Sequence, residues 1–319
     1  MFLRCLSLFS EERKLKMKKA IIILIGLCLF VGVIATGSYG LSEENTAIYE
    51  QAAALETDAD NFGFDGFAFT DYPVAFYDGD RDYVLSWHDN SYEITKRKAV
   101  MDFTVATAYP IDGHYEVLSP TVEKMSSLLG LLSTGSSDYG AEEHTATLWH
   151  EAFHCYQLTN YLENIENICP FEVNESIISE YADTNDQAVG LYKQQSQLLK
   201  KSLYETDIDK LRENIVKYKQ LDEERTALLS DEINAAEEYY TRVEGTARYI
   251  EACVYKLQLP ESFEENYIDN ITGYGGGTVK YYSKGMAMCM ILDNIAPDWK
   301  AGYDFSEPLI SIIYSELEI

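Results

Sequence analysis

Short apolar runs separated by turn signals mark the chain between residues 62 and 121. The runs are rich in aromatic and β-branched residues and lie at 67–70, 74–77, 83–87, 103–107 and 115–118. Asp-Gly pairs at 78–79 and 112–113 stand between runs and favour tight turns. This pattern predicts antiparallel β-hairpins, preceded by a polar and partly helical lead-in at 41–61.

From residue 142 onward, apolar positions recur at intervals of three and four, which is the period of an α-helix. The clearest example is residues 207–230, where this spacing joins Ile208, Leu211, Ile215, Tyr218 and Leu221. Charged residues fill the other faces of this segment. Together with residues 172–204, it predicts a long helical hairpin exposed to solvent.

Other helices are expected on both sides of this hairpin, at about 142–163, 232–257 and 286–294. Pro297 ends the last of them, because proline cannot continue a helix. Residues 273–277 read Gly-Tyr-Gly-Gly-Gly and predict a flexible loop before that helix. The expected fold class is therefore α+β and predominantly helical.

The sequence divides into three parts. Residues 1–40 contain lysines, an apolar run and then small residues, the pattern of a signal peptide or of an uncleaved membrane anchor. Residues 41–141 are the β-rich part. Residues 142–319 are the helical part, with the hairpin at about 172–230 inserted into it. Either fate of the first part places the rest of the chain outside the cytoplasm, secreted or anchored.

Composition adds two constraints. The net charge is −28, and residues 1–40 carry six basic and two acidic groups, so the remainder carries about −32. Such a charge repels nucleic acid and anionic membrane surfaces, which excludes a nucleic-acid partner and leaves the N-terminal segment as the expected membrane contact. The four later cysteines form either two disulfides or buried free thiols: Cys155, Cys169, Cys253 and Cys289.

Candidate chemistry lies in residues 150–154, which read His-Glu-Ala-Phe-His within a predicted helix. On a helix, His150 and His154 are one turn apart and project from the same face, where two imidazoles can bind one Zn²⁺. Glu151 lies beside them and can take a proton from water held by the metal. The pattern therefore predicts a zinc site with Glu151 as the general base.

A catalytic zinc site needs a third protein ligand and one open position. No histidine follows His154, so the third ligand is a downstream cysteine, aspartate or glutamate, of which glutamate is favoured. Glu244 is one candidate, since small residues follow it and let its helix approach the motif helix closely. Glu251 lies seven residues further on the same helical face and can orient a ligand histidine. Glu175, 21 positions after His154, is the other candidate ligand.

An H-E-x-x-H motif with a downstream glutamate resembles the gluzincin class of zinc metallopeptidases. Residues 244–249 are similar to the E-G-x-A-x-Y ligand helix of aminopeptidase N-like gluzincins, which favours Glu244 as the third ligand. Asn174-Glu175 resembles the ligand segment of thermolysin-like enzymes. The 89 residues between His154 and Glu244 exceed the interval usual in these families, so the hairpin is expected to be an insertion. The resemblance implies a zincin-like fold, a Zn²⁺ cofactor and a peptide or protein substrate.

Residues 145–300 are also similar to uncharacterised bacterial secreted proteins that combine H-E-x-F-H-x-x-Q, E-G-x-A-x-Y-x-E, Y-x-x-G, L-D and P-x-W. In this order Tyr282 begins Y-x-x-G and is the candidate donor to an oxyanion. Gln157 either orients His154 or lies at the surface. Two other functions remain open: a binding or scaffold protein on an inactive zincin fold, and a zinc hydrolase of non-peptide amides.

Overall fold

The structure is a computed structural model that describes residues 40–319 except 90, 103–104, 133–138 and 172–174. The predicted signal peptide or anchor at 1–40 lies, apart from Gly40, outside the described residues. Residues 41–319 fold as one unit. No helix in the described part of the chain is both long enough and apolar enough to cross a membrane.

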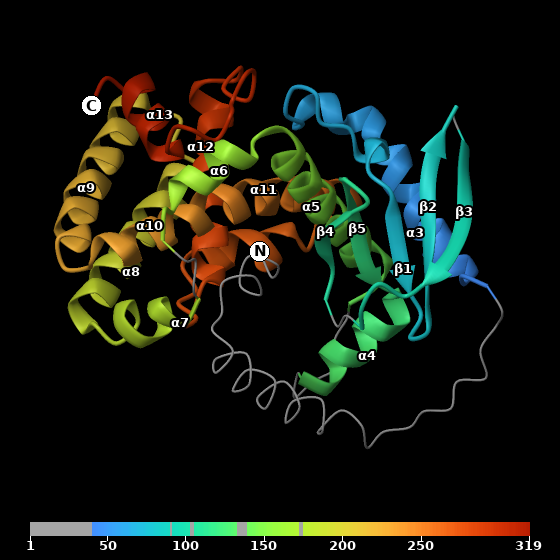
Figure 1. Ribbon diagram of the computed structural model, residues 1–319. Coiled ribbons are helices and arrows are strands. Elements are labelled where there is room, and N and C mark those ends of the chain that lie inside the picture. Colours follow the sequence, from blue (N-terminus) through green and yellow to red (C-terminus); the bar gives the residue numbers. More distant parts are fainter. Residues whose placement is uncertain (1–39, 90, 103–104, 133–138, 172–174) are drawn as a thin grey trace. The chain divides into compact units, whose positions relative to one another are not determined.

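The described residues contain a five-stranded mixed sheet with the strand order β3-β2-β1-β5-β4 (Figure 1). Its strands are β1 (Val74–Tyr77), β2 (Arg81–His88), β3 (Ser91–Lys98), β4 (Thr107–Ile111) and β5 (His114–Pro120). The pairs β1–β2 and β4–β5 are antiparallel, as the turn signals predict, and β2–β3 is a further antiparallel pair that no predicted turn announced. Strands β1 and β5 pair in parallel, which the sequence did not indicate. This pairing leaves β4 as one edge of the sheet.

The observed strands differ from the predicted ones in several places. Residues 67–70 form no strand; Phe69 begins a short 3₁₀ helix, η2 (Phe69–Asp71), and its ring stacks on Trp149 at 5.2 Å between centroids. The aromatic side chains there pack against a helix instead of pairing as a strand. Strand β3 was missed, because it is an exposed edge strand with few apolar residues. The strand predicted at 103–107 lies further along the chain: residues 103–104 are outside the described part, 105–106 are not in a strand, and β4 begins at Thr107.

Most of the described residues are helical, so the α+β class is confirmed at this level. The helices are α3 (Glu43–Ala54), η1 (Leu55–Asn61), α4 (Val122–Leu132), α5 (Ala141–Asn160), α6 (Leu162–Ile168), α7 (Glu175–Ile177), η3 (Ile178–Ala182), α8 (Asp186–Ser202), α9 (Ile208–Thr226), α10 (Asp231–Tyr239), η4 (Tyr240–Glu244), α11 (Gly245–Gln258), η5 (Glu264–Ile268), η6 (Asp269–Ile271), α12 (Val279–Ile295) and α13 (Leu309–Glu316). Helix α4 has no counterpart in the sequence-based expectation.

The predicted hairpin is present as α8 and α9, which pack against each other. Residues 172–174 of the helix predicted over 172–204 lie outside the described part, and the rest is broken at residues 183–185. There the Asp183 carboxylate accepts hydrogen bonds from the Gly-rich loop and from the start of α12. Gly277 N donates to it at 2.7 Å, Tyr274 Oη at 2.7 Å and Lys280 Nζ at 2.8 Å. The loop predicted as flexible is thus tied to the hairpin, and α12 begins earlier than expected, at Val279.

Helix α5, which carries the His-Glu-x-x-His motif, packs against α3, β4, β5 and α11. Its Trp149 and Phe153 are fully buried among aromatic rings, including Phe64 and Phe67. Trp149 Nε1 also donates a hydrogen bond to the carbonyl of Ala52 at 3.1 Å. The motif helix is therefore held on all of these sides, which fixes the direction of its polar face.

All four cysteines after residue 40 are free thiols, so the two-disulfide alternative is wrong. Cys155 and Cys289 are completely buried. Burial raises the pKa of both thiols, because a thiolate loses its hydration in an apolar interior. These cysteines therefore pack as small apolar residues.

We expect a stability loss in mild acid that depends on His144. This buried ring stacks on Phe76 and lies within 3.2 Å of Ser119 Oγ, and burial lowers its pKa to about 4. The unfolded chain binds a proton near pH 6.5 while the folded chain does not, so stability is complete above that pH and falls below it. Between pH 7.5 and 5 the loss is roughly 2 kcal/mol. Urea titrations at several pH values should show this loss of unfolding free energy in the wild type and not in His144→Phe. An equal pH dependence of the unfolding free energy in both proteins would contradict the prediction.

Candidate metal centre

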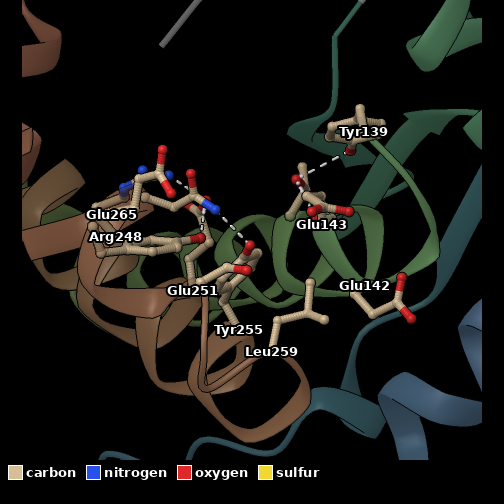
Figure 2. Close-up of a pocket in the computed structure, with 12 residues that line it drawn as sticks. Tyr139, Glu142, Glu143, Arg248, Glu251, Tyr255, Leu259 and Glu265 are labelled. Atoms are coloured by element: carbon tan, nitrogen blue, oxygen red, sulfur yellow. Dashed lines mark hydrogen bonds and ion pairs between the residues drawn. The ribbon is translucent and has the colours of Figure 1, made fainter. Parts of the chain in front are cut away.

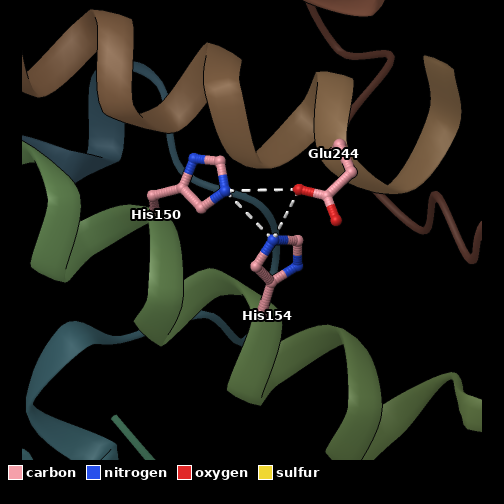
Figure 3. Close-up of side chains that lie close together, drawn as sticks. All are labelled: His150, His154 and Glu244. Carbon is pink, nitrogen blue, oxygen red and sulfur yellow. Dashed lines mark hydrogen bonds and ion pairs between the residues drawn. The ribbon is translucent and has the colours of Figure 1, made fainter. Parts of the chain in front are cut away.

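Three side chains converge at one point beside α5. His150 and His154 project from α5, and Glu244 projects from η4, directly before α11 (Figure 3). His154 Nε2 lies 3.0 Å from His150 Nε2 and 3.2 Å from Glu244 Oε2, and His150 Nε2 lies 3.5 Å from that oxygen. Tetrahedral ligands bound to zinc at their usual distances are roughly 3.3 Å apart. The three atoms therefore have the spacing of zinc ligands.

The outer nitrogen of each histidine has a fixed partner. His150 Nδ1 lies 2.9 Å from Glu251 Oε2, and His154 Nδ1 lies 2.6 Å from Gln157 Oε1. The Gln157 amide nitrogen donates to the Val243 carbonyl at 2.9 Å, so its oxygen is the atom that accepts from His154. With each Nδ1 donating its proton outward, both Nε2 atoms face the point where a metal would lie.

Electrostatics favours a cation at this point. Burial lowers the pKa of His150, but the Glu244 and Glu251 carboxylates outweigh it and raise this pKa to about 10. Burial raises the pKa of Glu244, yet the two histidines hold it well below its usual range. The carboxylates thus stabilise positive charge between the rings, which a proton supplies in the free protein and a divalent ion can supply in its place.

The position of Glu244 depends on two glycines. A Cβ on Gly285 would lie 1.9 Å from the Thr241 carbonyl oxygen, and a Cβ on Gly245 would lie 2.5 Å from Gly285 Cα. Helix α12 therefore crosses η4 and α11 at backbone contact. The prediction that small residues serve close approach to the motif helix is wrong for Gly245, which contacts α12 instead. The π-helical turn of η4 directly before this contact carries Glu244, and such turns are frequent at functional sites.

Glu151 lies on α5 next to His150 and is oriented by the sheet. The backbone N–H of Ala108, on edge strand β4, donates a hydrogen bond to Glu151 Oε2 at 3.0 Å. The Tyr282 ring stacks on the His150 imidazole at 6.4 Å between centroids. Burial raises the pKa of Tyr282, so its hydroxyl keeps its proton and can donate.

Glu175 is not one of the three converging residues. It begins α7 and is exposed, and the group of described residues that can hold a metal contains Glu244 in its place. Although the residue is exposed, its carboxylate is partly desolvated, and this desolvation together with the Glu244 charge raises the pKa of Glu175. The carboxylate is therefore within electrostatic range of the centre without being one of the three converging groups. Gln157, left open by the sequence, is completely buried and contacts His154.

Two residues that sequence reasoning missed complete the surroundings of Glu251. Tyr267 Oη donates to Glu251 Oε1 at 3.0 Å, and Arg248 Nη1 pairs with the same oxygen. Arg248 precedes Glu251 by three residues on one helix, so its contact was detectable from spacing. Tyr267 lies in η5, and nothing in the sequence indicates its contact.

The later L-D and P-x-W motifs have a structural role. Asp293 accepts hydrogen bonds from Tyr249 Oη at 2.7 Å and Trp299 Nε1 at 2.9 Å, and an ion pair from Lys300 at 2.6 Å. This network joins α11 to the end of α12 and the segment after it. The motifs therefore support the helix that follows Glu244 and do not reach the metal ligands.

Replacing Gln157 by Leu should weaken zinc binding by about 10- to 100-fold, because His154 loses the acceptor that fixes its ring and tautomer. Competition with a chelating dye measures this affinity. Gln194→Leu is the matched control, since Gln194 is an exposed residue of α8. Equal zinc affinity in both variants would show that the contact with His154 does not support the site.

No protein-family model matches this chain, and neither a curated protein nor a solved structure does. The chemistry of the site therefore follows from its own side chains. They provide three ligand atoms, a carboxylate oriented beside them and a phenol stacked on one ligand ring. This combination suits a metal site that activates water next to an acid–base group.

Proposed function

We propose that this chain is an extracytoplasmic zinc metallopeptidase of gluzincin type. The observation that carries the proposal is the convergence of His150 Nε2, His154 Nε2 and Glu244 Oε2 at 3.0–3.5 Å, with Glu151 next in sequence to the first ligand. A purely structural zinc site does not need Glu151. The extracytoplasmic location rests on the signal-peptide pattern of residues 1–40.

In the proposed reaction, His150, His154 and Glu244 would hold Zn²⁺, and the ion would supply Lewis-acid chemistry by lowering the pKa of water and polarising a carbonyl. Glu151 accepts a proton from the attacking water and returns it to the leaving amine. The Ala108 N–H holds one oxygen of Glu151 and so keeps the other available for this transfer. Tyr282 donates its hydroxyl proton in a hydrogen bond to the developing oxyanion.

The free edge of the sheet is a reason to propose a peptide as the substrate. Strand β4 is an edge strand, and its Ala108 N–H faces Glu151. An extended peptide can pair with such an edge, so that its backbone runs beside α5 and a carbonyl reaches the ligands. The proposed architecture is zincin-like: α5 carries the histidines, η4 carries the third ligand directly before α11, and α8 with α9 forms an insertion.

A substrate panel tests the proposal against its rivals. The full-length chain loaded with zinc should hydrolyse unstructured peptides, and a chelator should abolish this activity. A binding or scaffold protein would hydrolyse nothing in the panel, and a hydrolase of non-peptide amides would cleave only the small amides included in it. Either of these outcomes would contradict the metallopeptidase proposal.

A further inference from the structure

A cavity of about 720 Å³ is drawn in Figure 2. Its lining includes Glu251, which contacts the candidate ligand His150. Such a volume lies within the range of pockets that bind small organic groups. We call it the glutamate pocket; its lining residues include Glu142, Glu143, Glu251 and Glu265. Figure 2 shows Arg248, Glu251 and Glu265 on one side of it and Tyr139, Glu142 and Glu143 on the other.

The glutamate pocket and the metal centre share a wall. Glu251 lines the pocket, and its Oε2 atom lies 2.9 Å from His150 Nδ1. Glu143 and Thr147 line the pocket from α5 and lie eight and four residues before Glu151, on the same face of the helix. A peptide bound with a carbonyl at the ligands therefore has a neighbouring residue within reach of this pocket.

The charge of the lining is negative and largely uncompensated. Arg248 pairs with Glu251, so these two charges cancel. Glu143 accepts a hydrogen bond from Gly140 N at 2.9 Å and forms no ion pair with the described residues. The side chains of Glu142 and Glu265 make no hydrogen bond or ion pair with the described residues. Three carboxylates thus remain to attract a cation, in a cavity that excludes part of the solvent.

Aromatic rings add a second feature that suits a cation. Tyr139, Tyr255 and Tyr267 line the pocket, and the Arg248 guanidinium already lies 4.2 Å from the centre of the Tyr267 ring. One guanidinium, that of Arg248, is therefore already bound in the lining by the Glu251 carboxylate and the face of the Tyr267 ring. The remaining tyrosines and free carboxylates offer the same combination to a second cationic group.

We propose that the glutamate pocket binds the positively charged side chain of an arginine or lysine in the peptide substrate, next to the bond to be cleaved. The choice of a peptide as ligand rests on the proposed function, whereas the preference for a cation rests on the lining alone. Glu142 and Glu265 are the specificity-determining residues, since their carboxylates have no other partner among the described residues.

A binding experiment separates this inference from the proposed catalysis. The probes are Nα-acetyl-arginine amide and its uncharged isostere Nα-acetyl-citrulline amide, titrated into the zinc-loaded full-length chain by calorimetry or NMR. The arginine probe should bind at least about tenfold more tightly than the citrulline probe. Equal binding of the two probes would overturn the inference.

Variants assign the effect to this pocket. Glu142→Gln combined with Glu265→Gln should remove the preference for arginine, while Glu213→Gln combined with Glu224→Gln should retain it, because the latter pair is exposed on α9. A preference that survives in the first double variant would place the cation elsewhere and overturn the inference. If the preference follows the variants but no peptide is cleaved, the pocket stands and the proposed function fails.

Discussion

Replacing Glu151 by Gln should lower peptide hydrolysis by about 10²- to 10⁴-fold while the zinc content stays unchanged. Glutamine keeps an oxygen that can accept the Ala108 N–H, so the side chain keeps its position, but it cannot accept the proton of the attacking water. The three ligand atoms belong to other residues, so the metal remains bound. Steady-state kinetics together with elemental analysis of the same sample measure both effects.

Glu163→Gln is the matched control for this prediction. Glu163 is exposed on α6 and carries the same charge, so its replacement should leave the turnover unchanged. Full activity of Glu151→Gln, with zinc still bound, would remove Glu151 from the mechanism. Loss of zinc from that variant would mean that Glu151 supports the ligands and not proton transfer.

Gly285→Ala should destabilise the protein by about 3 kcal/mol or more, because the new methyl group overlaps a backbone atom. The added Cβ would lie 1.9 Å from the Thr241 carbonyl oxygen, and a backbone atom cannot turn away as a side chain does. Helix α12 must then move from η4 and α11, which also displaces Glu244 from the histidines. Thermal unfolding and zinc titration of the variant measure the two consequences.

The contrasting variant is Gly190→Ala. Gly190 lies within α8, and a Cβ there meets nothing within 4 Å. Alanine is the better helix former, so this change should leave stability equal or raise it by up to about 1 kcal/mol. If Gly285→Ala were as stable as Gly190→Ala, the two helices would not need backbone contact to place Glu244.

Local spacing explains what could be predicted of the site. His150, Glu151 and His154 lie within one turn and a half of a helix, so their relative directions follow from helix geometry alone. The same rule places Glu251 on the face of Glu244, and the structure brings it to His150 Nδ1. The resemblance of its segment favoured Glu244 over Glu175. In the structure Glu244 lies with the two histidines, and Glu175 is not part of that group.

The contacts that sequence could not predict join distant segments. Ala108 reaches Glu151 only because β1 and β5 pair in parallel and leave β4 at the edge next to α5. The predicted helix is broken at Asp183, whose hydrogen-bond donors lie more than 90 residues further along the chain. A contact over that distance leaves no signal in the local sequence. Strand β3 has polar edge-strand composition, and its pairing with β2 outweighs its weak apolar pattern. In each case a tertiary contact decides against local preference.

The most direct test of the central claim is the zinc content of the full-length wild-type chain, Glu244→Gln and Glu175→Gln, measured by elemental analysis at equal protein concentration. A single three-ligand site predicts about one zinc per chain in the wild type and in Glu175→Gln, and a strong loss in Glu244→Gln. Loss of zinc in Glu175→Gln alone, or a wild type that binds no zinc after metal is supplied, would contradict it.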